Sequence, residues 1–259
     1  MVALAVVVLA AGCGGGQRSS VARYIKQVNA IELGLRGPLA QVASVNRQVL
    51  GHTDLAKLTP KLARSERTIA TLRTRLAALT PPPAAVVLQR RLLTLVDAEA
   101  GLAHEVHQLA VFLPRYQTAL RGLDPASARF RRSIGGAKTA GAEAQVLDRY
   151  RSDLSGPLAR LRRLDPPPVL RPSYAAQVAT LTRVSATAGA LAQALREKRT
   201  AEARSLIQQL GAASVMGGSL AAQQAQISAV RSYDGRVRGI NDLAARVRAE
   251  FARLQSTLR

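Results

Sequence analysis

Two histidines lie close together in the sequence and could share a metal ion. His104 and His107 are three residues apart with Glu105 between them, and residues at this spacing lie on one face of a helix. The segment is HEVH, however, whereas zinc proteases need His-Glu-x-x-His and di-iron bundles use paired Glu-x-x-His units. A structural zinc site normally has four ligands, and His52 is the only further histidine. We therefore expect no metal, no other cofactor, and a histidine pair that is solvated or bonded to a neighbouring side chain.

Three polar residues occupy positions where the spacing of their neighbours favours an apolar side chain. They are Glu32, Asn46 and Glu99. One interpretation is a polar binding groove, or a pair of carboxylates that handles a proton. The other is that these residues fix the register of packed helices, as buried polar residues do in coiled coils. Because arginine is in large excess, we expect each glutamate to have a basic partner, and we favour the register interpretation.

No motif for covalent or phosphate chemistry accompanies these candidates. The chain has no Gly-x-Ser-x-Gly sequence, and the SVMGGS segment at 214–219 lacks the strand that such a motif follows. The GGAK segment at 135–138 lacks the first spaced glycine and the Ser or Thr of a Walker A loop. We therefore predict no catalytic residues and a protein that is not an enzyme.

Cys13 is the only cysteine in the chain, so it cannot form an internal disulfide. It follows residues 1–11, which are apolar throughout but too few to span a bilayer, since a span needs ~20 residues. Their length is typical of the hydrophobic part of a signal peptide, with small residues where cleavage occurs. The sequence LAAGC at 9–13 resembles the lipobox of bacterial lipoproteins.

This resemblance implies a modification and a location. In lipoproteins the cysteine thiol receives a diacylglyceryl group and the leader is cut before it. Residues 1–12 would then be the signal peptide, and Cys13 the lipidated first residue of the mature chain. Three glycines follow Cys13, so we predict a flexible tether at 13–20. The protein is expected on the extracytoplasmic face of the cell membrane.

The charge of the chain limits the classes of partner that it is expected to bind. It has 37 Lys and Arg against 16 Asp and Glu, which gives a formal net charge of +21. The basic residues are spread evenly along the chain, whereas a nucleic-acid reader usually concentrates them on one element. We therefore expect no nucleic acid as a partner. Beside the membrane lipid anchor, the candidates are anionic lipids, envelope polymers and another membrane protein.

Apolar residues recur in alternating steps of three and four over long stretches. One run is Leu55, Leu58, Leu62, Ser65, Ile69, Leu72, Leu76 and Leu79, and similar runs occupy 21–49 and 88–113. Such spacing is typical of helices that pack through heptad seams. Only 3% of the residues are aromatic and Trp is absent, so the core must be Ala, Leu and Val. The predicted fold is all-α, an elongated antiparallel bundle of about six or seven long helices.

Two proline triplets interrupt these helical patterns. They occur in LTPPP at 79–83 and in LDPPP at 164–168. Consecutive prolines cannot continue a helix, because each lacks a backbone N–H and restricts the residue before it. With helical patterns on both sides, the triplets predict two helical hairpins that turn at 80–83 and 165–168.

The triplets also point to an internal repeat. They are 85 residues apart, and the Arg75-Leu76 pair before the first aligns with Arg160-Leu161 before the second. We predict two halves of the bundle, 21–134 and 135–259. The paired LxPPP hairpins behind a lipobox resemble uncharacterised actinobacterial helical lipoproteins over most of the chain, a resemblance that implies no activity.

The expected function is therefore that of a non-enzymatic, lipid-anchored module that serves as a scaffold or binds a partner at the cell envelope. The alternative is a ligand- or metal-binding lipoprotein subunit that serves a membrane transporter.

Overall fold

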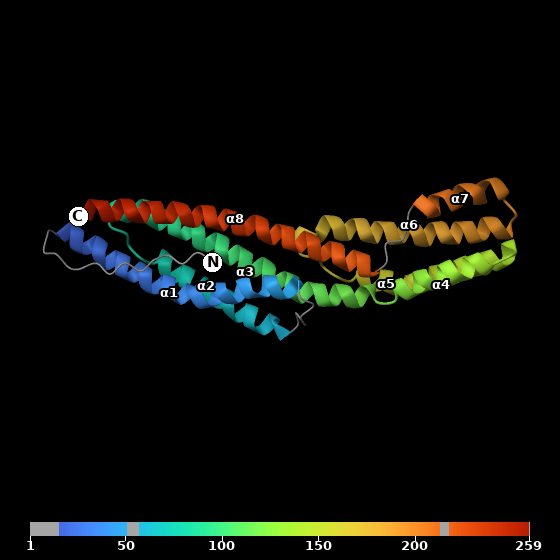
Figure 1. Ribbon diagram of the computed structural model, residues 1–259, viewed down its shortest axis with the longest axis horizontal. Helices are drawn as coiled ribbons and strands as arrows, with labels where there is room; N and C mark the ends of the chain where they lie inside the picture. Colours follow the sequence, from blue (N-terminus) through green and yellow to red (C-terminus); the bar gives the residue numbers. More distant parts are fainter. Residues whose placement is uncertain (1–15, 51–56, 213–217, 259) are drawn as a thin grey trace. The chain divides into compact units, whose positions relative to one another are not determined.

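The structure, a computed structural model, describes residues 16–50, 57–212 and 218–258 (Figure 1). These residues form eight α-helices and no strand, which confirms the predicted all-α class. The helices are α1 (Gly16–Leu50), α2 (Thr59–Ala77), α3 (Val86–Leu120), α4 (Leu123–Gly136), α5 (Ala140–Leu161), α6 (Arg171–Arg196), α7 (Thr200–Ala212) and α8 (Gly218–Leu258). The short helices α4 and α7 bring the number above the six or seven that we predicted.

Most of the N-terminal predictions concern residues outside the described part of the chain. The predicted signal peptide 1–12 and Cys13 both lie there. The predicted tether 13–20 overlaps α1, which begins at Gly16, so residues 16–20 are helical. The third glycine thus starts the helix rather than preceding it.

Among the helices described, none has both the length and the apolar character that a bilayer span requires.

The helices belong to two compact units. Unit 1 contains the described residues up to Val111 and those from Val230 onward, and unit 2 contains Phe112–Ala229. Helices α3 and α8 each supply a section to both units. The boundary that we placed between residues 134 and 135 lies inside α4, and therefore inside unit 2. The C-terminal section of α8 belongs with the N-terminal helices, so the units do not follow chain order.

The first proline triplet joins α2 and α3 in an antiparallel hairpin within unit 1. An ion pair between Arg73 Nε and Asp97 Oδ1, 2.8 Å long, links the two helices across the pair. Nearer the turn, Gln89 Nε2 donates a hydrogen bond of 2.7 Å to the carbonyl oxygen of Leu76. This oxygen belongs to the last turn of α2 and also accepts the backbone N–H of Leu79 at 3.2 Å. The bond therefore ties the end of α2 to the start of α3.

The second triplet makes the same connection between α5 and α6 in unit 2. An ion pair between Asp148 and Arg196 links the far ends of this hairpin. The Tyr174 hydroxyl donates to the carbonyl oxygen of Leu161 in the last turn of α5. Tyr174 and Leu161 each follow Gln89 and its acceptor by 85 residues, so donor and acceptor recur at the predicted repeat. Both predicted hairpins are confirmed.

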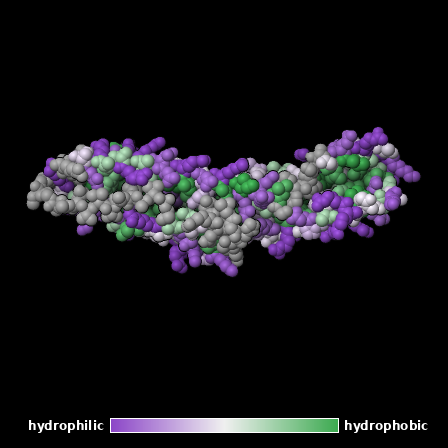
Figure 2. Space-filling view, viewed as in Figure 1, coloured by the Kyte–Doolittle hydropathy of each residue, from purple (hydrophilic) through white to green (hydrophobic). Residues whose placement is uncertain are grey.

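The predicted heptad seams form the core of the hairpins. The buried residues of α2 are Leu62, Ser65, Ile69, Leu72 and Leu76. Leucine and alanine fill most of the core of both units, as the composition indicates. Unit 2 adds an aromatic cluster, in which Phe112, Tyr116 and Tyr174 have ring centroids 5.4 to 5.8 Å apart. Hydrophilic residues cover much of the coloured face in Figure 2, with apolar residues in separate patches.

Candidate functional site

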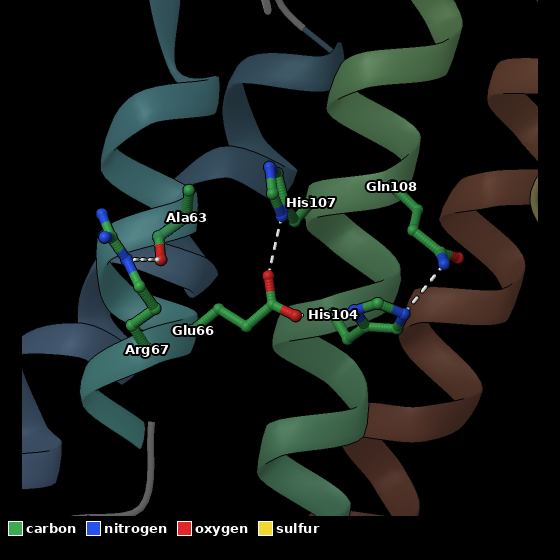
Figure 3. A network of polar contacts seen from close by, with 6 residues as sticks. All are labelled: Ala63, Glu66, Arg67, His104, His107 and Gln108. Atoms are coloured by element: carbon green, nitrogen blue, oxygen red, sulfur yellow. Dashed lines mark hydrogen bonds and ion pairs between the residues drawn. The ribbon is translucent and has the colours of Figure 1, made fainter. Parts of the chain in front are cut away.

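The histidine pair of α3 is joined to a carboxylate of α2 (Figure 3). His104 Nδ1 lies 2.6 Å from Glu66 Oε1, and His107 Nδ1 lies 2.7 Å from Glu66 Oε2. Gln108 Nε2 lies 2.8 Å from His104 Nε2, so it donates to that nitrogen when His104 Nδ1 donates to Glu66. Each histidine thus bonds through Nδ1 to a different carboxylate oxygen of Glu66. The pair is bonded to a neighbouring side chain, one of the two arrangements that we expected.

The two histidines change the pKa of Glu66. Burial by itself would raise the pKa of Glu66, but the hydrogen bonds and charges of His104 and His107 outweigh it and hold the pKa below its ordinary value. The ionised carboxylate of Glu66 therefore binds His104 and His107, which lie one turn apart on α3. In the part of the chain that the structure describes, no group of three or more His, Cys, Asp or Glu is placed to hold a metal ion.

Glu105, between the two histidines, faces a different helix. Its Oε1 accepts a hydrogen bond of 2.6 Å from the Ser232 hydroxyl, and its Oε2 pairs with Arg236. Both partners belong to α8. The HEVH segment therefore links α3 to α2 through its histidines and to α8 through its glutamate, which is a structural role.

Unit 1 has a partly open cavity of about 370 Å³ between α1, α3 and α8. Its walls are mainly apolar, and they include Leu35 and Leu39 from α1, Leu92 and Leu95 from α3, and Val237 and Ile240 from α8. Pockets that bind small molecules usually have volumes of about 300–1,000 Å³, apolar walls and a few polar groups. This cavity is at the lower end of that range.

Two carboxylates from different helices line this cavity. Glu32 of α1 forms an ion pair of 3.7 Å with Arg36, one helical turn further along. Glu99 of α3 has no hydrogen-bond donor and no basic side chain as a partner within the described residues. Burial raises the pKa of Glu99 to about 7, and the charge of Glu32 adds to the rise. Burial also raises the pKa of Glu32, although Arg36 opposes the effect.

The cavity changes how the seam glutamates are interpreted. We favoured a register role in which each glutamate has a basic partner, and Glu99 has none among the described residues. The structure brings Glu32 and Glu99 together in the lining of one cavity, as our other interpretation, a polar groove or a pair of carboxylates, requires, but most of the walls are apolar. The third seam residue, Asn46, has a side chain outside the described part.

The sequence analysis missed the contribution of α8 to this site. Tyr233 and Asn241 provide the remaining polar groups of the lining. Tyr233, Val237 and Ile240 follow one another in steps of four and three, the same spacing as in the seams of the other helices. Following that pattern would have identified the face of α8, although not the helices that it meets.

Unit 2 has a larger hollow between α5 and α6, of about 640 Å³, that is more open to solvent. Two of the polar side chains along it have partners on the facing helix. Asp148 pairs with Arg196, and Arg162 donates a hydrogen bond of 3.1 Å to the Thr182 hydroxyl. The cavity of unit 1 is the stronger candidate, because it is more enclosed and contains a carboxylate without a partner among the described residues.

Comparison with known proteins finds no match among family models, curated proteins or solved structures.

Proposed function

We propose that this protein is a non-enzymatic binding module, anchored by a lipid on Cys13 to the extracytoplasmic face of the membrane, and that unit 1 binds a small apolar ligand. The observation that carries the proposal is the cavity between α1, α3 and α8, with its apolar walls and few polar groups.

The physical argument rests on burial. Transfer of apolar surface from water into an apolar cavity contributes about 25 cal/mol per Å². The walls come from leucine, valine, isoleucine and alanine side chains, which offer shape and contact but few hydrogen bonds. A ligand that fills such a site is therefore selected mainly by its apolar surface and its size.

The lipid anchor is supported by the lipobox-like LAAGC sequence that ends at Cys13. The non-enzymatic assignment is supported by the lack of a nucleophile or phosphate-loop motif in the sequence. Pairing of His104 and His107 with Glu66 also commits the two described histidines to a contact between helices.

A scaffold function receives less support than ligand binding. In the described residues, exposed large apolar side chains occur as single residues, such as Leu33 on α1 and Ile207 on α7, or as two adjacent residues of one helix. Scattered residues of this kind are normal on soluble surfaces. The cavity of unit 1, and not a patch of exposed apolar residues, is therefore the feature that we assign to binding.

The test uses a neutral apolar dye, N-phenyl-1-naphthylamine, whose fluorescence rises when it leaves water. The chain from Gly14 onward contains every described residue and no lipid. We expect one saturable site per chain. Ala40 lines the cavity, so Ala40→Phe should fill the space and weaken dye binding at least tenfold.

Ala30→Phe is the matched control, because Ala30 is exposed on the same helix. It should leave the affinity unchanged. Equal affinity of the two variants, with helical circular dichroism preserved, would contradict the proposal. So would dye fluorescence that never saturates.

A further inference from the structure

The cavity of unit 1 has a charge that is opposite to that of the whole chain. Its lining contains two carboxylates, Glu32 and Glu99, and one basic side chain, Arg36. The ion pair between Arg36 and Glu32 leaves Glu99 as the one lining charge without a described counter-ion. The chain as a whole has a net charge of +21, which attracts anions. A cation would therefore be recognised only through the local groups of the cavity.

The walls restrict the kind of cation. Ca²⁺ requires about six to eight oxygen ligands, and Mg²⁺ keeps a polar octahedral shell. The described lining offers two carboxylates, one of them paired with Arg36, and the side chains of Tyr233 and Asn241, among apolar side chains such as Leu95 and Val96. Such walls suit a hydrocarbon chain and not a hydrated metal ion. An ammonium group attached to a hydrocarbon chain fits both parts of the lining.

We propose that the cavity binds an apolar monocation, an amine or quaternary ammonium with a hydrocarbon tail, with its charged group at Glu99 and its tail along the walls of α1, α3 and α8. This proposal rests on the proposed function, since it names the class of ligand that the cavity takes.

Because Glu99 can gain or lose a proton, binding of the cation should depend on pH. The lining groups that can titrate or are charged are Glu32 and Arg36 from α1, Glu99 from α3 and Tyr233 from α8, while α2 supplies Leu76. Burial and the nearby Glu32 raise the pKa of Glu99 to about 7. A ligand with a permanent positive charge should bind more tightly as Glu99 ionises, so affinity rises between pH 6 and pH 8.

Three probes of equal chain length test the proposal by calorimetry with the chain from Gly14 onward. They are octyltrimethylammonium, octanol and octanoate. We expect octyltrimethylammonium to bind at least tenfold more tightly than octanol at pH 8, and octanoate to bind most weakly. The advantage of the cation over octanol should shrink at pH 6.

Glu99→Gln should remove the preference for the cation and leave octanol binding unchanged. Glu202→Gln is the matched control, because Glu202 is exposed on α7 in unit 2. Equal binding of octanol and the cation would overturn this inference and support the proposed function. A preference for octanoate would also overturn it, because net charge would then control selectivity. No binding of any probe would overturn both, and an unchanged cation preference in a folded Glu99→Gln protein would overturn the assignment to Glu99.

Discussion

Glu66 and Glu99 are the same residue type in unit 1, and the fold shifts their pKa values in opposite directions. Glu66 is half-buried, but two histidines donate to it and hold its pKa below the ordinary value. Glu99 faces an apolar cavity beside a second carboxylate, so its pKa rises to about 7. Desolvation favours the neutral form of a carboxyl group, and donors favour the charged form. The difference therefore lies in which groups the helices bring to each carboxylate.

The two carboxylates should have opposite effects on stability. The raised pKa of Glu99 means that the folded protein favours its protonated form. The stability that this contributes is complete below the ordinary pKa of 4.5 and is lost as the pH rises through about 7. At ~1.4 kcal/mol per pKa unit, the difference is up to about 3 kcal/mol. We therefore expect Glu99→Gln to raise the free energy of unfolding at pH 8 and to change it little at pH 4.

Glu66→Gln is the matched substitution for this experiment. The lowered pKa of Glu66 means that its carboxylate stabilises the fold above its ordinary pKa, and that this contribution is lost as the pH falls through the folded value. Its replacement should lower the free energy of unfolding at pH 8. Urea unfolding followed by circular dichroism measures both variants. A loss of stability at pH 8 in Glu99→Gln would contradict the burial argument.

At the scale of elements, the proline triplets do more than end helices. In each hairpin, a side chain from the first turn of the second helix donates to a carbonyl oxygen in the last turn of the first helix. The donor is Gln89 in one hairpin and Tyr174 in the other. The carbonyl oxygens of Leu76 and Leu161 each accept a backbone N–H as well, from Leu79 at 3.2 Å and from Leu164 at 2.9 Å, whereas the prolines that follow cannot donate. A long polar side chain at the same position of both repeats supplies a second donor. The position is therefore polar in both repeats, although its residue type differs.

Tyr174→Phe should destabilise the second hairpin by removing this donor. A hydrogen bond of this kind contributes about 0.5–1.5 kcal/mol net, so we expect a loss of about 1 kcal/mol in the free energy of unfolding. Tyr116 is in the same aromatic cluster, with its ring centroid 5.7 Å from that of Tyr174. Its hydroxyl forms no hydrogen bond within the described residues, so Tyr116→Phe should cost less than half as much. Equal losses in urea unfolding would show that ring packing, and not the bond, matters.

At the scale of the whole molecule, charge and lipid would hold the protein at the membrane in different ways. The net charge of +21 favours anionic lipids, at up to ~1 kcal/mol for each basic residue near the surface. This attraction is screened over ~10 Å at moderate salt and ~3 Å at 1 M salt. Two acyl chains on Cys13 would anchor the protein through the hydrophobic effect, which salt does not screen.

Cys13→Ala should therefore release the protein from membranes washed with 1 M salt, while the unchanged protein stays. Gly14→Ala is the control, because it alters the neighbouring residue and keeps the thiol. Immunoblots of the membrane and soluble fractions measure the distribution. Retention of Cys13→Ala in salt-washed membranes, with the leader still removed before residue 13, would contradict a lipid on this cysteine.

The helices and their hairpins could be predicted from the sequence because their causes are local. Steps of three and four place Leu62, Ile69 and Leu76 on one face of α2, and this face is buried. Three prolines prevent a helix from continuing wherever they occur. The buried face of α2 and the places where the hairpins turn therefore follow from the local sequence.

The candidate site depended on the tertiary structure. Glu32 and Glu99 are far apart in the chain, and their seam positions say that each faces a neighbouring helix but not which one. Their meeting in one cavity depends on α8, whose C-terminal section packs in unit 1 with the first helices of the chain. Local periodicity determines the face that a helix buries, whereas the packing of distant helices decides which side chains share that space and which carboxylate is left without a partner.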